Sequence, residues 1–389
     1  MKKLYYPHGI GKKNSRNSMV DNVVVKASGR INLIGEHVDY NGGFVLPASI
    51  DKKTIIDLNS IQGKECFIES ETIKKEFKIN ILKLHKSEIH WENYIIGAMH
   101  NITILKKLKI GAFRCKISGN LPIGSGVSSS SALICGFVTG LNYLFKLGLS
   151  TNTILEIVSE VEQKFIGLRG GIMDQFTILN GKKDKLILLN CQDKSLKYVH
   201  SNFNNYKLLL LNTNVKHNLA NTAYNDRVDE CKMALNIIRK KYKKYNYLTQ
   251  VEEDTLNQFK SIMSKKIYSR ALFVIQENKR TLKSVKKIEE SKLLDLGKLM
   301  YQSHEGLKNL YQVSCDELDY LVDFTLQFEQ IIGARMMGGG FGGCTINLID
   351  ESFVDDFVQL VSKNYEKKFN IKLNPSIVKI EDGIIINDR

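Results

Sequence analysis

The sequence predicts a two-domain protein that mixes helices and strands. Its 389 residues exceed the size at which a single hydrophobic core is usual. Strand-like and helix-like segments alternate in the first half, whereas long helical patterns fill the second half until strand character returns near its end. We therefore expect one domain over residues 1–210 and another over residues 211–389.

The predicted elements follow from β-prone runs and from apolar residues at helical spacing. In the first half, strands are expected near residues 23–33, 44–57, 113–117, 186–190 and 207–212, and helices at 91–105, 129–145 and 153–166. In the second half, helices are expected at 223–242, 255–262, 268–286 and 292–310, and strands at 344–349 and 376–386.

The overall composition excludes several classes of protein. With 43% hydrophobic and 25% charged residues, the chain is typical of globular proteins. Its net charge of +15 comes from scattered lysines, not from an arginine-rich arm or a nucleic-acid module. The seven cysteines form no CxxC pair, and no apolar run is long enough to span a membrane. We expect a cytoplasmic monomer with reduced thiols that binds neither nucleic acid nor membrane.

Charged side chains gather at the end of the first predicted strand. The segment of residues 29–43, GRINLIGEHVDYNGG, contains Arg30, Glu36, His37 and Asp39. Such groups resist burial without a partner, and strand ends often carry functional side chains. Carboxylates accept hydrogen bonds from sugar hydroxyls and imidazole can donate or accept, so Glu36, His37 and Asp39 predict a hydroxyl-binding site. The alternative is a plain hairpin closed by residues 41–43, in which these groups only contact solvent.

A second candidate site is a glycine- and serine-rich loop before a helix. The segment of residues 121–133, LPIGSGVSSSSAL, contains Gly124, Ser125 and Gly126, and a helical pattern starts at Ser129. Glycines allow close backbone approach, and a helix N-terminus attracts phosphate. The loop therefore predicts a phosphate site, although it lacks the lysine of a Walker A motif. Serine hydroxyls there could ligate Mg²⁺. The alternative is a serine-rich cap on a buried helix.

Two carboxylates and a second glycine loop complete the candidates. Glu162 falls within the apolar stripe of the helix at 153–166, where Mg²⁺ or a structural salt bridge would have to offset its charge. Asp174 lies among apolar residues that could tune its proton affinity, as a base acting on a hydroxyl requires. Residues 335–348 match GxGxxG but continue as a strand, which favours a loop closing over a ligand rather than a dinucleotide fold.

The chain resembles the galactokinases, members of the GHMP small-molecule kinase superfamily, in four motifs that keep the family order and spacing. These are GRINLIGEHVDYNGG, PIGSGVSSSSAL, GGIMDQF and RMMGGGFGG, with smaller matches at WENYIIGA, AYNDRVDEC and VSCDELD. The resemblance extends from about residue 23 to residue 382. It implies an α+β fold with an N-terminal domain, a ferredoxin-like C-terminal domain and an active site in the cleft between them.

The resemblance also implies an activity, the ATP-dependent phosphorylation of α-D-galactose at its anomeric hydroxyl. Asp174 would accept or orient the hydroxyl proton, and Arg30 would keep that aspartate ionised and stabilise the transferring phosphoryl group. The sugar would be bound through Glu36, His37, Val38, Asp39, Gly171 and Tyr224. The ATP phosphates would be bound by Gly124, Ser125, Gly126, Val127, Ser128, Ser129 and Ser130, and Mg²⁺ by Ser130 and Glu162.

Five positions depart from the family motifs, and two alternative activities remain. The departures are Ser28 for proline, Ser125 for glycine, Val127 for leucine, Ser131 for alanine and Met337 for threonine. None removes a charged catalytic group, so nucleotide affinity would be affected rather than activity. The alternatives are a kinase for a related sugar, such as N-acetylgalactosamine, arabinose or galacturonate, and a galactose-sensing regulator without catalysis. The uninterrupted serine run from 128 to 131 favours the enzyme.

Overall fold

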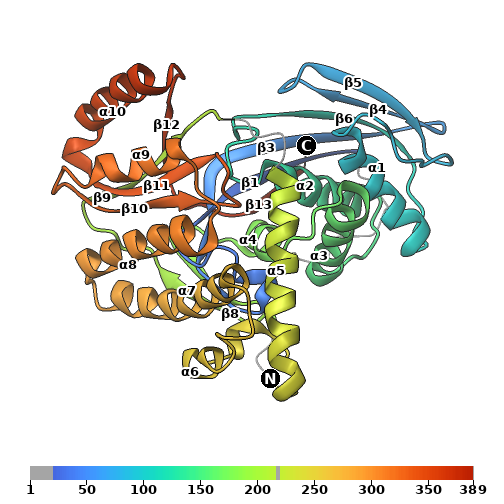
Figure 1. The fold of residues 1–389 in the computed structure, drawn as a ribbon. Helices are drawn as coiled ribbons and strands as arrows, with labels where there is room; N and C mark the ends of the chain where they lie inside the picture. Colours follow the sequence, from blue (N-terminus) through green and yellow to red (C-terminus); the bar gives the residue numbers. More distant parts are fainter. Residues whose placement is uncertain (1–20, 216–219, 389) are drawn as a thin grey trace.

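The computed structural model describes residues 21–215 and 220–388, and it has two domains side by side (Figure 1). The strands of the first half are β1 (Asn22–Asn32), β2 (Phe44–Val45), β3 (Pro47–Ile61), β4 (Glu65–Ser70), β5 (Lys75–Asn80), β6 (Ala112–Gly119), β7 (Lys185–Asn190), β8 (Leu196–His200) and β9 (Tyr206–Asn212). Its helices are η1 (Asp39–Asn41), α1 (Glu92–His100), η2 (Asn101–Leu105), α2 (Ser129–Leu144), α3 (Thr151–Glu160), η3 (Val161–Ile166) and α4 (Met173–Asn180).

The second half begins with helices and ends with strands, as its sequence pattern predicts. Its helices are α5 (Ala220–Lys241), η4 (Leu248–Gln250), α6 (Glu253–Asn257), α7 (Lys265–Glu289), α8 (Leu293–Glu305), η5 (Gly306–Tyr311), α9 (Asp316–Thr325), η6 (Glu351–Phe353) and α10 (Val354–Phe369). Its strands are β10 (Ile331–Met337), β11 (Cys344–Asp350), β12 (Asn374–Val378) and β13 (Ile384–Asp388).

The first domain is built on a six-stranded sheet of order β13-β1-β3-β6-β4-β5, in which only β4 and β6 pair in parallel. Helix α2 packs directly on β1 and β3. Two glycines allow this close approach, since a Cβ at Gly136 would lie 2.7 Å from Ile56 and one at Gly140 would lie 2.5 Å from Leu58. The helix that follows the glycine- and serine-rich loop is therefore fixed against the sheet.

The second domain has a four-stranded antiparallel sheet of order β10-β11-β9-β12. With α9 and α10 as crossovers, this order is that of a ferredoxin-like β-α-β-β-α-β unit. Side chains of a strand alternate between faces, so Leu209 and Leu211 contact the α9 and α10 side while Leu208 and Leu210 face the opposite side. Helices α8 and α9 lie on opposite sides of this sheet in Figure 1, which confirms the predicted two-domain α+β architecture.

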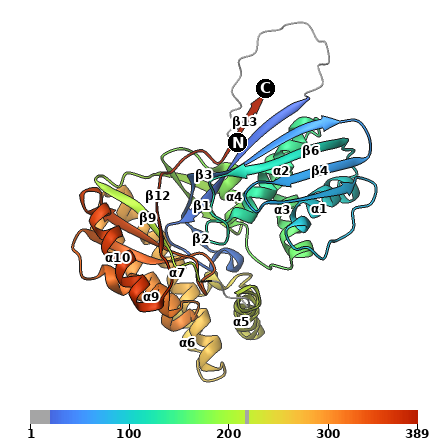
Figure 2. The ribbon, with the colours of Figure 1, turned by 90° about the horizontal axis from the view of Figure 1, so that it is seen from above.

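The two halves of the chain are interleaved. Strand β13 at the C-terminus pairs with β1 at the edge of the first sheet, and Figure 2 shows it leaving the second domain to reach that edge. Strand β9, which spans residue 210, pairs with β11 and β12 of the second sheet. A third sheet of order β2-β7-β8 contacts α7. The division into residues 1–210 and 211–389 stays a prediction.

Some sequence predictions of elements were wrong. The single strand expected at 376–386 is two strands, because the chain turns at Gly383, whose N–H donates to Gly181 O at 3.1 Å. The sequence patterns also missed β4, β5, β8, β10, α4, α9 and α10. Throughout residues 21–215 and 220–388, no helix has both the length and the apolar character needed to cross a membrane.

Candidate active site

A cavity of about 200 Å³ lies between the two domains and contains most of the predicted sugar and catalytic residues. Its lining comes from the end of β1 and the loop after it, from η3, from the segment before and within α4, from α5, and from the glycine loop after β10. The lining residues include Arg30, Glu36, His37, Asp39, Glu162, Gly170, Gly171, Met173, Asp174, Tyr224, Gly338, Gly340 and Phe341. Segments separated by about 300 residues therefore form one site, with the glycine loop on it as the sequence predicts.

Arg30 and Asp174 form a bidentate ion pair in this cavity. Arg30 Nε donates to Asp174 Oδ1 at 2.7 Å, and Arg30 Nη2 donates to Oδ2 at 3.1 Å. A β-bulge between Ser28 and Arg30 sets the direction of the arginine, and Asp174 lies in the first turn of α4, where a helix favours negative charge. Burial lowers the pKa of Arg30, but the charges of Asp174, Glu36 and Asp39 and the hydrogen bond to Asp174 together raise it above its usual value. The side chain of Asp174 stays 28% exposed, so a ligand in the cavity can reach it.

The glycine- and serine-rich loop is tied to this pair. Arg30 Nη1 donates to Gly126 O at 2.5 Å, and Ser128 Oγ donates to Asp174 Oδ2. Ser128 has a φ of 59°, a left-handed conformation that is uncommon for a residue with a side chain. The sequence assigned Ser128 to the phosphates, and the structure shows that its hydroxyl contacts the predicted catalytic aspartate.

Glu36 is held by the second domain. Its side chain is 3% exposed and its Oε1 lies 2.8 Å from Arg335 Nη2. The same oxygen accepts the N–H of Gly338 at 2.8 Å. Arg335 is fully buried on β10 and donates from Nη1 to the carbonyls of Asn32 and Leu33 at 3.0 and 3.1 Å. Burial raises the pKa of Glu36, and Arg335 opposes that shift. Sequence reasoning missed Arg335. An arginine within an otherwise apolar strand could have indicated a buried charge that needs a partner.

His37 and Asp39 are not solvated groups of a plain hairpin. His37 is 4% exposed, and burial, followed by the charge of Arg227, lowers its pKa to about 3. Asp39 is half-buried at the cavity wall. Burial, followed by the charge of Asp174, raises the pKa of Asp39 to about 7. A Cβ at Gly171 would lie 2.1 Å from Asp39 Oδ2, so only glycine lets these two segments meet.

Of the remaining predicted sugar-binding residues, Tyr224 lines the cavity and Val38 does not. Tyr224, on α5, lines the cavity, and α5 is fixed to the loop before Gly170 by an ion pair of 2.7 Å between Arg169 and Asp229. Val38 does not line the cavity, because its side chain is fully buried in the core beneath it.

A second cavity of about 300 Å³ lies on the other side of the glycine- and serine-rich loop. Its polar edge includes Gly124, Ser129 and Ser130, and its wall is apolar and aromatic, with Trp91, Tyr94, Ile117, Leu121, Ile123 and Leu133. Sequence reasoning missed this wall, although Trp91 and Tyr94 belong to the WENYIIGA match. Ser125 and Val127 line neither cavity, since Ser125 Oγ accepts from Asn212 Nδ2 at 3.0 Å and Val127 is buried in the core.

The Glu162 carboxylate is buried, and both of its oxygens accept hydrogen bonds. It lies on the π-helical turn η3 and lines the first cavity. Ser131 Oγ donates to its Oε1 at 2.6 Å, and Gln175 Nε2 donates to its Oε2. Within the described part of the chain, no three acidic, histidine or cysteine side chains form a metal cluster. Mg²⁺ in nucleotide enzymes needs only one or two protein oxygens besides the phosphates, and a carboxylate and a hydroxyl such as those of Glu162 and Ser130 have the donor chemistry that it takes.

Four of the five departures from the family motifs make side-chain hydrogen bonds in the structure, and the fifth, Val127, packs in the core. Ser28 Oγ donates to Ile50 O at 2.7 Å beside the bulge, and Met337 Sδ accepts the N–H of Asn32 at 3.4 Å. Ser125 and Ser131 make the hydrogen bonds given above. These substitutions thus join neighbouring segments of the site without touching the Arg30–Asp174 pair.

Comparisons with known proteins agree with this geometry. Three family models match, described as the galactokinase galactose-binding signature (residues 15–58), the GHMP kinases N terminal domain (93–182) and the GHMP kinases C terminal (284–367). Galactokinase of Thermosipho africanus is 38% identical over 92% of this chain and 98% of its own length. Galactokinase of Clostridium beijerinckii is 39% identical over 91% and 92%.

Solved structures show the same relationship. The crystal structure of Lactococcus lactis galactokinase complexed with galactose has a TM-score of 0.90 and 29% identity, covering 94% of this chain and 95% of that one. Mevalonate kinase of Methanococcus jannaschii, at 20% identity and a TM-score of 0.65 over 94% and 99%, shares the fold. The chain belongs to the galactokinase family of GHMP kinases.

Proposed function

We propose that this protein transfers the γ-phosphoryl group of ATP to the anomeric hydroxyl of α-D-galactose, giving α-D-galactose 1-phosphate and ADP. The proposal rests mainly on the position of the Arg30–Asp174 pair. The pair lies in the polar cavity and is hydrogen-bonded to Gly126 and Ser128. Both residues belong to the loop between this cavity and the apolar one. A sugar on one side and a nucleotide on the other would meet at this pair. The galactokinase relatives and the galactose complex of the Lactococcus enzyme support the choice of sugar.

Phosphoryl transfer from ATP to the sugar requires mainly that the two substrates are held in line and that negative charge is neutralised. The anomeric oxygen attacks the γ-phosphorus, the bond between that phosphorus and the β–γ bridging oxygen breaks, and ADP leaves with the bond electrons. Asp174 takes or directs the hydroxyl proton, and Arg30 offsets the charge of the carboxylate and of the transferring group. Phosphoryl transfer depends mainly on such positioning and charge neutralisation.

Sugar recognition falls to the residues around this pair. Glu36 and Asp39 supply acceptors for hydroxyls, His37 supplies a neutral imidazole, and Tyr224 closes one wall. Gly171 contributes space and its backbone. Arg335 and the N–H of Gly338 keep the Glu36 carboxylate in one orientation. Sugar binding therefore costs little side-chain entropy at this residue.

The nucleotide occupies the loop and the second cavity. Backbone N–H groups of residues 124–130 and the N-terminus of α2 bind the phosphates, and the wall with Trp91 and Tyr94 takes the base. Glu162 and Ser130 would hold Mg²⁺, which would supply charge neutralisation for the phosphates. The enzyme works in the cytoplasm as a monomer, and the absence of disulfides among its seven cysteines suits that compartment.

A coupled assay of ADP release over a panel of free sugars tests the proposal. Galactose should give the highest kcat/KM, with formation of the 1-phosphate. A clear preference for N-acetylgalactosamine, arabinose or galacturonate would overturn the choice of substrate. ADP release that does not depend on any sugar would overturn the activity.

A further inference from the structure

His37 is held tightly in the wall of the sugar cavity. Its φ is 62°, it is buried, and its ring lies among three tyrosines, with ring centroids 4.8 Å from Tyr311, 5.3 Å from Tyr224 and 5.9 Å from Tyr40. Its Nε2 is buried and makes no hydrogen bond of good geometry within residues 21–215 and 220–388, although a contact with the Gly339 backbone raises the pKa of the ring. Both residues line the cavity. A buried polar atom without a well-formed hydrogen bond is costly, so this nitrogen is the one that a ligand would satisfy.

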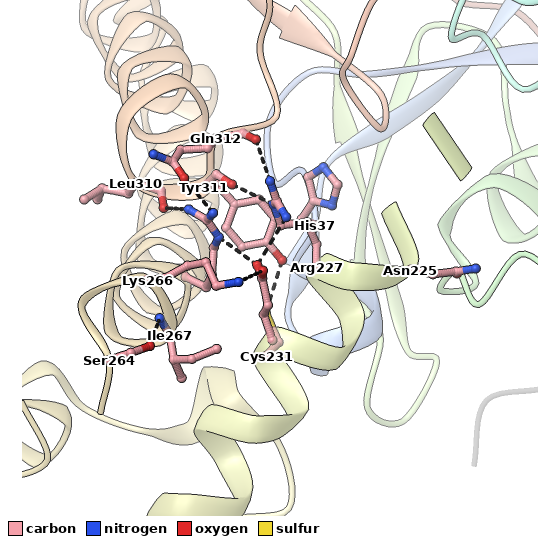
Figure 3. A network of polar contacts seen from close by, with 12 residues as sticks. His37, Asn225, Arg227, Cys231, Ser264, Lys266, Ile267, Leu310, Tyr311 and Gln312 are labelled. Carbon is pink, nitrogen blue, oxygen red and sulfur yellow. Dashed lines mark hydrogen bonds and ion pairs between the residues drawn. The ribbon is translucent and has the colours of Figure 1, made fainter. Parts of the chain in front are cut away.

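The other ring nitrogen begins a chain of hydrogen bonds that crosses into the second domain. His37 Nδ1 lies 2.8 Å from Tyr40 Oη, Tyr40 Oη lies 2.7 Å from Tyr311 Oη, and Tyr311 Oη lies 3.1 Å from Cys231 Sγ. Figure 3 shows Tyr311 and Cys231 beside His37, on elements far from it in the sequence. Because the pKa of His37 is lowered to about 3, its ring is neutral, with one donor and one acceptor nitrogen.

The direction of the chain follows from the strengths of its groups. An imidazole nitrogen is a better acceptor than a thiol sulfur. The favoured order therefore starts at the Cys231 S–H, passes through Tyr311 and Tyr40 as donors, and ends on His37 Nδ1 as acceptor. Burial raises the pKa of the Cys231 thiol to about 11, so that proton is available. The proton of the histidine is then on Nε2, the buried ring nitrogen that lacks a well-formed hydrogen bond within the described residues.

Tyr311 is itself held by a buried charged network. Arg227 Nε donates to Tyr311 O at 2.9 Å, and Arg270 Nη1 donates to Leu310 O at 2.5 Å. Both arginines pair with Glu230, at 3.3 Å and 2.9 Å. The dashed lines of Figure 3 converge on this segment from α5 and α7. The phenol of Tyr311 therefore has a fixed place.

We propose that Tyr311 is a positioning residue of the sugar site, which acts through Tyr40 to keep His37 in the tautomer that donates from Nε2. This inference rests on the proposed function, because it assumes that His37 reads a sugar hydroxyl. It gives the site one donor beside the acceptors Glu36 and Asp39. A hydroxyl that accepts from His37 can donate to a carboxylate, whereas a group that can only donate cannot satisfy both.

The test removes one oxygen and keeps the ring. Tyr311→Phe preserves packing against Phe273, whose ring centroid is 4.7 Å away. Loss of one neutral hydrogen bond predicts a rise of about three- to tenfold in the galactose KM, with the ATP KM and kcat unchanged. The control is Tyr301→Phe, which removes another phenol, bonded to Thr325 at 2.8 Å outside the cavity, and should leave both KM values as they are.

A spectroscopic measurement separates positioning from packing and from failure of the proposed function. In protein labelled with ¹⁵N-histidine, with His37→Gln used to assign the signal, the wild type should show His37 protonated on Nε2, and Tyr311→Phe should show a mixture of tautomers. This readout does not depend on activity. An unchanged tautomer in Tyr311→Phe, or a wild-type ring protonated on Nδ1, would overturn the inference even if galactose is phosphorylated. An enzyme inactive on galactose would overturn the proposed function instead.

Discussion

The buried ion pair between Arg335 of the second domain and Glu36 of the first leads to the most specific prediction about the sugar site. In Arg335→Met, the Glu36 carboxylate would stay buried without its cation, and the carbonyls of Asn32 and Leu33 would lose their donor. Removing one partner of a buried ion pair costs about 3–5 kcal/mol. With an unfolding entropy of about 2.1 cal/mol/K per residue, the 389 residues convert this cost into a fall in Tm of about 4–6 °C.

The matched variants decide whether the pair is the cause. Glu36→Gln should also lower Tm, because it leaves the Arg335 charge buried and unpaired. The double variant should lose clearly less than the sum of the two single losses, because it buries no unpaired charge. Lys106→Met removes a more exposed pair with Glu156 and should change stability by less than about 0.5 kcal/mol.

The Tm and the galactose KM are both measured for each single variant and for the double variant. Every variant at Glu36 or Arg335 should raise the galactose KM, by about 10- to 100-fold where a charged hydrogen bond to the sugar is lost. The double variant should therefore regain stability without regaining affinity. Strictly additive losses in Tm would show that the two side chains are not coupled, and a double variant with normal galactose KM would refute the role given to Glu36.

Three further predictions concern other parts of the site. Because the pKa of Asp39 is raised to about 7, the galactose KM should increase as the pH falls below that value and the carboxylate takes a proton, and Asp39→Asn should flatten this dependence. Gly171→Ala should raise the galactose KM at least about tenfold by displacing Asp39, whereas Gly170→Ala should not, since its Cβ would approach only Tyr224 Oη at 3.7 Å. Ile123→Asp, at a 57% exposed position on the second cavity, should raise the ATP KM alone, and Ile104→Asp, at a 58% exposed position, should not.

Each of these has an outcome that contradicts it. A galactose KM independent of pH in the wild type would remove Asp39 from sugar recognition. Equal effects of alanine at Gly170 and Gly171 would mean that the loop moves as a whole. An unchanged ATP KM in Ile123→Asp would place the nucleotide base outside the second cavity.

Sequence reasoning located the segments of the site because their composition conflicts with simple packing. Three charged or titratable groups after an apolar strand, and an aspartate among apolar residues, indicate a functional site by their local composition alone. The pairing of Arg30 with Asp174 came from the family resemblance, since the two residues are 144 positions apart and nothing in their local patterns joins them. The ferredoxin-like second domain also came from the resemblance.

The residues that support the site could not be predicted from local patterns. Arg335 interrupts an apolar strand, but only the tertiary fold brings it to Glu36 across the two domains. Tyr40 and Tyr311 look like ordinary core aromatics, and their phenols meet only because the fold brings η1 and η5 together. Strand β5, KEFKIN, is too polar on one face to be distinguished from a surface loop.

The direct test of the central claim is catalysis by Asp174. With saturating ATP and galactose, the wild type should release ADP and form galactose 1-phosphate in equal amounts. Asp174→Asn should lower kcat by at least about 100-fold, while calorimetry still detects galactose binding and thermal unfolding stays cooperative. Because Arg30 loses its ion-pair partner, the Tm should fall, by no more than about 6 °C. A kcat near normal in that folded variant would contradict the assignment of Asp174 as the group that handles the hydroxyl proton.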